Sequence, residues 1–133
     1  MTVSPDIQPL KIAFYTRGSE FNGNTIDQKG LGGSESALLY MARELSRRGH
    51  VLSVFCTCDK PGNYQGIEYR HSDEFLSYCH SHPQDVCIFS RLYEPLVQAN
   101  SRIKILWLHD IAGSQYYTGA LPALDQHVHR YFV

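Results

Sequence analysis

The sequence lacks any apolar run approaching the roughly 20 residues of a membrane-spanning helix. It also lacks an excess of either charge, since 12 basic and 13 acidic side chains give a net charge of −1. This balance argues against a nucleic-acid-binding protein, which needs a concentrated basic face. The beginning of the chain has neither the basic nor the apolar region of a secretory signal. We therefore expect a cytoplasmic protein in which residues 1–10 form a loose leader.

The four cysteines match no zinc motif. They are Cys56, Cys58, Cys79 and Cys87, and the one close pair is C-x-C rather than C-x-x-C. In a strand, both side chains of that pair would point to the same side. We expect four reduced thiols rather than a metal site or a disulfide framework.

What the sequence does contain is a regular alternation of strand-like and helix-like patterns. Apolar runs alternate with segments whose apolar residues recur at helical spacing. This alternation predicts one α/β domain over residues 11–133, with a doubly wound, Rossmann-like parallel sheet. The expected strand order is 3-2-1-4-5, with a sixth strand outside the fifth. The expected strands are residues 11–16, 51–56, 67–70, 85–90, 103–108 and 129–133. The expected helices are residues 35–48, 73–80 and 120–126, with a short helix or helical turn at residues 93–99.

The connections and one helix cap can also be predicted. Residues 17–31 are expected to form a long polar loop, and residues 59–66 a turn-rich connection. Ser72 is the expected cap of the helix that follows it. The strand at residues 103–108 is continuous enough to be buried on both faces.

The predicted strand order places a ligand site at one edge of the sheet. The order reverses between the first and fourth strands, so a ligand is expected beyond their carboxyl ends. The segments that arrive there are residues 16–34, Ser90-Arg91 and His109-Asp110. Arg91 is a candidate anion contact, although a lone arginine is more often a solvated surface charge.

The segment Gly30-Leu-Gly-Gly-Ser-Glu-Ser36 contributes a glycine-rich turn to this edge. Its three glycines can take positive φ and allow close approach to the backbone. Ser34 is the expected N-cap of the helix, and Gly49 the residue that ends it. Free N–H groups and the positive end of the helix dipole suit an anion such as a phosphate. The alternative is a turn that merely connects strand and helix.

Two stretches resemble a known family. The first is Lys11-Ile-Ala-Phe-Tyr-Thr16, followed by Gly32-Gly-Ser-Glu35 and a helix that ends in Arg48-Gly-His-Val51. The second is Ile105-Leu-Trp-Leu-His-Asp110, which is similar to that family's fifth strand. Together they resemble the N-terminal domain of group 1 (family 4) GT-B glycosyltransferases. The resemblance covers most of the chain from residue 11 onward, whereas residues 59–82 are generic.

The resemblance implies transfer of a sugar from a nucleotide-diphosphate donor, usually with retention at the anomeric carbon. Gly32, Gly33 and Ser34 would contact the donor phosphates, and His109 would lie near the transferred sugar. Asp110 would be a second catalytic candidate. It would orient His109, cap the next segment or bind an acceptor hydroxyl. No metal or other cofactor is implied, because helix dipoles and basic side chains stabilise the leaving diphosphate.

The implied partners are the nucleotide sugar, an acceptor and a second domain. The acceptor would be a sugar, a lipid or a protein, with peripheral membrane contact as an option. The family's C-terminal domain carries most of the nucleotide site, and its motifs are absent from these 133 residues. We therefore expect an acceptor-binding half that transfers no sugar alone.

Other phosphate-binding folds fit less well. A dinucleotide fingerprint that starts at Gly30 would need a third glycine where Glu35 stands, and no Gly-Lys-Ser/Thr occurs. A receiver-like domain would want acidic residues where Arg17 and Gly18 stand. Beside a phosphate, Glu35 should point away or meet an acceptor hydroxyl. The remaining alternative is a non-catalytic, Rossmann-like interaction or nucleotide-binding module, because fold alone does not fix function.

Overall fold

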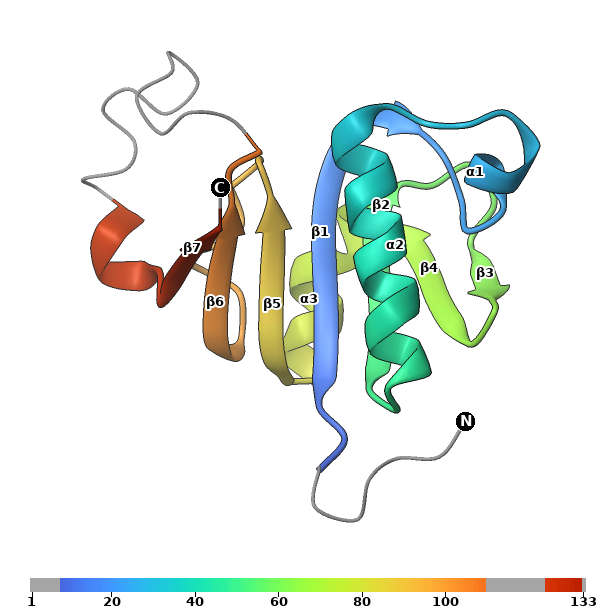
Figure 1. The fold of residues 1–133 in the computed structure, drawn as a ribbon. Coiled ribbons are helices and arrows are strands. Elements are labelled where there is room, and N and C mark those ends of the chain that lie inside the picture. Colours follow the sequence, from blue (N-terminus) through green and yellow to red (C-terminus); the bar gives the residue numbers. More distant parts are fainter. Residues whose placement is uncertain (1–7, 110–123, 133) are drawn as a thin grey trace.

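A seven-stranded sheet with helices on both sides forms the domain in the computed structural model, which describes residues 8–109 and 124–132 (Figure 1). The strands are β1 (Lys11–Glu20), β2 (Val51–Thr57), β3 (Gly62–Tyr64), β4 (Ile67–His71), β5 (Gln84–Ser90), β6 (Ser101–Trp107) and β7 (Arg130–Phe132). The helices are α1 (Thr25–Gln28), α2 (Gly33–Arg47) and α3 (Phe75–Ser81), with short 3₁₀ turns η1 (Ser72–Glu74) and η2 (Asp125–His127). No helix among these residues is both long and apolar enough to cross a bilayer.

The strand order is β3-β4-β2-β1-β5-β6-β7, and every neighbouring pair is parallel except β3 with β4. It differs from the expected order by the added edge strand β3, which lies in the predicted turn-rich connection. The six expected strands keep their predicted sequence across the sheet. A tight turn at Gln65 and Gly66, both at positive φ, closes the β3–β4 hairpin. The fold is thus α/β with a mostly parallel, Rossmann-like sheet.

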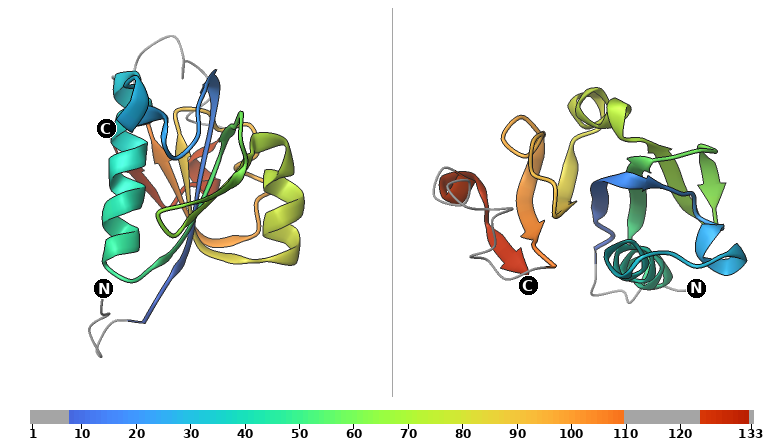
Figure 2. Two further views of the ribbon diagram at one scale, coloured as in Figure 1. Left: turned by 90° about the vertical axis from the view of Figure 1, so that its right-hand side faces the viewer. Right: turned by 90° about the horizontal axis from the view of Figure 1, so that it is seen from above.

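The core is divided into two layers by the sheet. Helix α2 covers one face of the sheet and α3 the other (Figure 2). Strand β1 sends Ile12 and Phe14 to the α2 face, and Ala13 and Tyr15 to the α3 face. This alternation is the period-2 pattern of a strand buried on both sides. Each fully buried large apolar side chain contributes about 1.5–3 kcal/mol. All four cysteines are buried free thiols, with Cys56 and Cys58 together in the α2 layer as expected.

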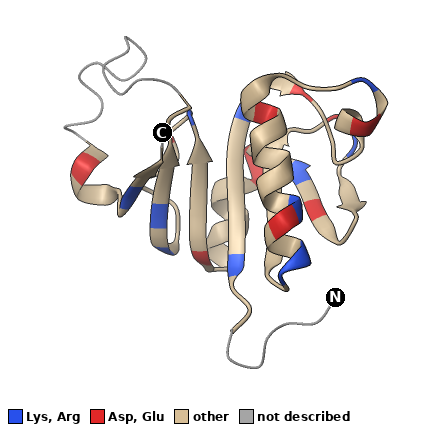
Figure 3. Ribbon diagram, viewed as in Figure 1, with Lys and Arg blue, Asp and Glu red and all other residues tan. Residues whose placement is uncertain are grey.

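Helix α2 is the longest element and leads away from the glycine-rich turn. Its buried face consists of Leu38, Leu39 and Ala42. An acidic residue lies in its first turn and a basic one in its last, which complements the helix dipole (Figure 3). At its end Gly49 has φ +99°, and the N–H groups of Gly49 and His50 donate to the carbonyls of Ser46 and Leu45. The prediction that Gly49 ends this helix is confirmed.

Several local predictions are wrong. Strand β1 continues through four residues expected as loop, and pairs again at Glu20 with Thr57 after an irregularity. Residues 93–99, predicted as a short helix or a helical turn, form hydrogen-bonded turns. The cap of η1 is His71, whose Nδ1 accepts from the Asp73 N–H at 3.1 Å, rather than Ser72. Strand β6 is only partly covered, with Ile103 39% exposed.

The two ends of the described chain differ from the expected outline. Leu10 is tied to the sheet, since its N–H donates to His50 Nδ1 and its carbonyl accepts from the Val51 N–H. The last expected helix begins outside the described residues, and its described part is the short turn η2. Strand β7 is confirmed as the sixth expected strand, parallel to β6.

Candidate functional site

A pocket of about 190 Å³ lies at the carboxyl edge of the sheet, where the strand order reverses. We call it the rim pocket. Three separate segments form it: the end of β1, the start of α2 and the residues that follow β5. Two of the predicted segments, residues 16–34 and Ser90-Arg91, meet here as the strand order predicts. Its lining residues are Thr16, Arg17, Gly18, Ser19, Ser34, Glu35, Ser90, Arg91 and Leu92.

His109 is joined to this pocket through Ser90. The Ser90 hydroxyl and the His109 Nε2 are 2.9 Å apart, and the imidazole stacks on Trp107 with ring centroids 4.4 Å apart. Ser90 is the last residue of β5 and lines the pocket. Of the predicted site residues, Ser34 lines the pocket, and His109 contacts the lining residue Ser90. Asp110 lies outside the described residues, so its role stays a prediction.

The backbone takes left-handed conformations at both of these strand ends. Arg91 has φ +65° and His109 has φ +62°. Such conformations cost L-residues roughly 1–2 kcal/mol and cluster at functional sites. The Arg91 N–H donates to the Trp107 carbonyl at 2.8 Å, which fixes the chain as it leaves β5. Two strained residues side by side on one edge support a functional role for that edge.

This strain can be tested at Arg91. Both Arg91→Gly and Arg91→Ala remove the cation, but only glycine takes positive φ without cost. We expect the glycine variant to unfold with a free energy about 1 kcal/mol higher than the alanine variant.

The matched control is Arg102, an exposed β6 residue in extended conformation. There the alanine variant should be the more stable of the two, because glycine weakens a strand. Urea denaturation of all four variants gives the free energies of unfolding to be compared. The same ranking at both positions would remove the argument from strain.

The glycine-rich turn differs from the prediction in three respects. Only Gly30 has a positive φ, of +78°. The N-cap of α2 is Gly32, in extended conformation at φ −63° and ψ 167°, and Ser34 lies inside the first turn. Gly32 lines a neighbouring hollow with Gly30 and Lys29, whereas Ser34 lines the rim pocket. A β-carbon on Gly33 would meet no atom within 4 Å, so this position faces open space.

Glu35 folds back over the start of its own helix, so the first of its two predicted arrangements, pointing away, is not seen. The second, a contact with an acceptor hydroxyl, stays a prediction. The Glu35 carboxylate accepts from the Ser34 hydroxyl at 3.2 Å, and a β-carbon on Gly32 would lie 2.7 Å from Glu35 Oε2. A carboxylate at a helix N-terminus is stabilised by the free N–H groups and the dipole. An anionic ligand at these N–H groups would therefore lie beside a group of like charge.

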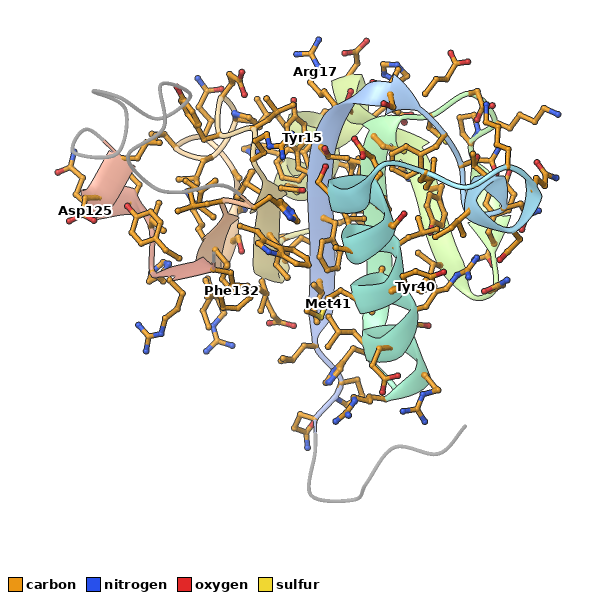
Figure 4. All side chains as sticks on the ribbon, turned by 45° about the horizontal axis from the view of Figure 1, so that its top comes forward. Tyr15, Arg17, Tyr40, Met41, Asp125 and Phe132 are labelled. Carbon is orange, nitrogen blue, oxygen red and sulfur yellow. The ribbon has the colours of Figure 1, made fainter. Side chains whose placement is uncertain are left out.

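The sequence argument did not single out Arg17, which comes directly after the expected end of the first strand. It supplies a second guanidinium to the rim pocket, beside that of Arg91. Burial raises the pKa of Tyr15, and its interaction with Arg17 opposes this shift. Figure 4 shows Tyr15 and Arg17 on β1. Arg17 follows the expected end of a strand, beside the point where the strand order reverses. That position was the feature of the sequence that could have identified it as a site residue.

No protein-family model matches the chain, and no curated protein is significantly similar to it in sequence.

The chemistry of the rim pocket is that of an anion and hydroxyl site. It offers two guanidinium groups, three serine hydroxyls and the free N–H groups at the start of α2, together with one carboxylate. Guanidinium and N–H donors suit a phosphate, and the carboxylate suits a neutral hydroxyl. Within residues 8–109 and 124–132, no group of three or more His, Cys, Asp or Glu side chains is placed to hold a metal ion.

Proposed function

We propose that this chain is the acceptor-binding half of a nucleotide-sugar-dependent, retaining glycosyltransferase of the GT-B type. The observation that carries the proposal is the rim pocket. It joins the start of α2 to the Ser90–His109 pair at the carboxyl edge of a parallel sheet. The proposal includes the doubly wound arrangement, which the packing of α2 and α3 on opposite faces of the sheet supports.

In this proposal each part of the pocket has a separate task. The backbone at Gly32, Gly33 and Ser34 approaches the donor diphosphate, and Arg17 and Arg91 balance its charge. His109 lies beside the transferred sugar, close enough to hydrogen-bond to one of its hydroxyl groups. Stabilisation of the leaving diphosphate is then a matter of placed positive charge, and no metal or further cofactor is required. A second domain would supply the rest of the nucleotide site.

Glu35 would serve the acceptor rather than the donor. Its carboxylate lines the rim pocket and already accepts from one hydroxyl, that of Ser34. A sugar hydroxyl could take the place of Ser34 without adding charge. This assignment separates a cationic donor side from an anionic acceptor side within one cavity.

The proposal is tested by titrating the 15N-labelled chain with UDP-glucose, UDP and glucose up to millimolar concentrations. We expect shift changes at Ser34, Arg91 and His109, and severalfold weaker binding in Gly33→Ala, where the added methyl group blocks close approach to the backbone. The control is Tyr40→Ala, an exposed position farther along α2, which should bind as the wild type does. Shift changes confined to residues outside the rim pocket, or none with any nucleotide sugar, would overturn the proposal.

The purified chain is also expected to transfer no sugar to any acceptor, because the donor-binding half is not among its 133 residues.

A non-catalytic interaction module is the second candidate, and one observation favours it. The α2 side of β6 and β7 carries exposed apolar side chains, among them Ile103 at 39% and Phe132 at 38% exposure. Exposed apolar groups that lie together often mark a protein contact. A chain that binds no nucleotide sugar would leave this candidate in place.

A further inference from the structure

A hollow of about 410 Å³ lies between the second half of α2 and the turn of the β3–β4 hairpin. We call it the hairpin hollow, and its lining residues are Arg43, Ser46, Arg47 and Gln65. A β-carbon on Gly66 would lie 3.9 Å from the Ser46 Oγ, so the turn lies against the helix at this point. Every lining side chain carries an N–H or O–H donor, and none is an acid.

The helical spacing of the lining residues places two cations next to each other. Arg43, Ser46 and Arg47 stand at i, i+3 and i+4, so their side chains share one face of α2. Like charges at this spacing repel each other, and an anion between the two guanidinium groups would remove that repulsion. The negative end of the helix dipole, equivalent to about half an elementary charge, opposes an anion here. It is outweighed, because three guanidinium groups and two carboxylates at this end of α2 leave one net positive charge.

Both arginines are held in place by bonds that leave other N–H groups unused. Arg43 pairs with Asp27 at 2.8 Å and donates to the Gly23 carbonyl at 3.0 Å, and its side chain is only 22% exposed. Arg47 binds the two carboxylate oxygens of Glu44 through Nε and Nη2. A guanidinium has five N–H donors in a rigid fork, so each arginine keeps donors for a ligand. Two cations that are already ordered lose little conformational freedom when a ligand binds.

We propose that the hairpin hollow binds a phosphate group, either as the free ion or as part of a small phosphorylated molecule. Guanidinium groups match phosphate oxygens in pairs, and two of them lining one hollow suit a doubly charged group. The Ser46 hydroxyl and the Gln65 amide supply neutral donors for the remaining oxygen atoms. The hollow shares no residue with the rim pocket, so this site goes beyond the proposed function and does not depend on it.

The experiment titrates the 15N-labelled chain with sodium phosphate and, in a second arm, with glucose 6-phosphate. Sodium chloride at matched ionic strength is the reference. We expect saturable amide shift changes at Arg43, Ser46, Arg47 and Gln65 with both phosphates at millimolar concentrations, and no saturation with chloride. Equal affinity in the two arms would identify the phosphate group alone as the recognised unit, and tighter binding of the ester would identify a phosphorylated small molecule as the ligand.

A pair of neighbouring arginines gives a matched comparison. Arg47→Gln should weaken phosphate binding at the hairpin hollow about tenfold or more, the effect of one lost charge-assisted hydrogen bond. The control is Arg48→Gln. Arg48 also pairs with Glu44, at 2.9 Å, and its side chain is 65% exposed against 64% for Arg47, but it does not line the hollow. Its replacement should leave the affinity nearly unchanged, although it removes the same charge from the same helix.

Urea unfolding checks that both variants fold. Absence of saturable shift changes at the hairpin hollow in the wild type would overturn the proposal. Equal affinities of Arg47→Gln and Arg48→Gln would overturn it as well, because general charge attraction does not distinguish the two positions. Shift changes confined to the rim pocket would end the proposal for the hairpin hollow and leave the proposed function in place.

Discussion

Truncation of Phe75 to alanine is expected to lower the free energy of unfolding by about 3–5 kcal/mol. Phe75 opens α3 and is 1% exposed. Its ring centroid lies 4.9 Å from that of Tyr15, 5.2 Å from that of Phe55 and 5.6 Å from that of Phe89. It therefore joins three neighbouring strands, β1, β2 and β5. Removing it leaves a cavity that these strands cannot close without breaking their pairing.

The comparison for Phe75 is Tyr40, an aromatic residue of α2 that is 59% exposed. Tyr40→Ala should change the free energy of unfolding by less than about 0.5 kcal/mol, as exposed positions usually do. Urea midpoints of the two variants give the measurement. Because domains of this size are stable by only about 5–15 kcal/mol, the Phe75 variant should be partly unfolded at moderate temperature. Similar midpoints for both variants would show that the α3 layer contributes little.

Gly23→Ala is expected to be the second large effect, at about 1–3 kcal/mol of destabilisation. A β-carbon at Gly23 would lie 2.4 Å from the Tyr64 Cβ, 2.7 Å from its Cγ and 2.8 Å from the Tyr69 Cε1. Tyr64 and Tyr69 pack edge to face across the β3–β4 hairpin, with Tyr69 1% exposed. The new methyl group must push this pair or its own segment outward.

The displaced segment is also fastened by Arg43, which donates to the Gly23 carbonyl at 3.0 Å and pairs with Asp27 at 2.8 Å. The matched variant is Gly33→Ala at the first position of α2, where a β-carbon meets no atom within 4 Å. This variant should be neutral or up to about 1 kcal/mol more stable, since alanine is the better helix former. Hydrogen exchange should show faster opening of residues 21–28 in the Gly23 variant alone. Equal stability of the two alanine variants would contradict the packing argument.

Both predictions concern the layers that hold the rim pocket in place. Phe75 supports β1 and β5 from the α3 side, through Tyr15 and Phe89. Gly23 allows the chain to cross the α2 side before it reaches Gly32. Loss of nucleotide binding in either variant would follow from loss of the fold, which is why the binding test uses Gly33→Ala instead.

The sequence by itself determined the α/β class and the succession of six strands across the sheet. It also placed the end of α2 at Gly49 and the convergence of residues 16–34 with Ser90 and Arg91. These features follow from local information. Hydrophobic periodicity distinguishes strand from helix, glycine favours the left-handed helix end, and right-handed crossovers restrict the topology.

The sequence was misleading where two local solutions compete. Ser34 and Ser72 are good cap residues, but the caps are Gly32 and His71, because the direction in which the chain enters each helix decides which group reaches the free N–H. The β3–β4 hairpin was missed, since a three-residue edge strand has too few residues to show a period.

Only the tertiary structure decided how the candidate site is built. The 2.9 Å contact of Ser90 with His109 joins residues 19 positions apart through the β5–β6 register, and no spacing in the sequence encodes it. Glu35 can fold back onto Gly32 because glycine has no β-carbon, and only the three-dimensional structure shows that these two residues are in contact. Left-handed backbone at Arg91 and His109 contradicts the local preference of both residues, and it persists because neighbouring strands hold each end in place. Local preferences thus specified the sheet, and packing between distant segments specified the chemistry at its edge.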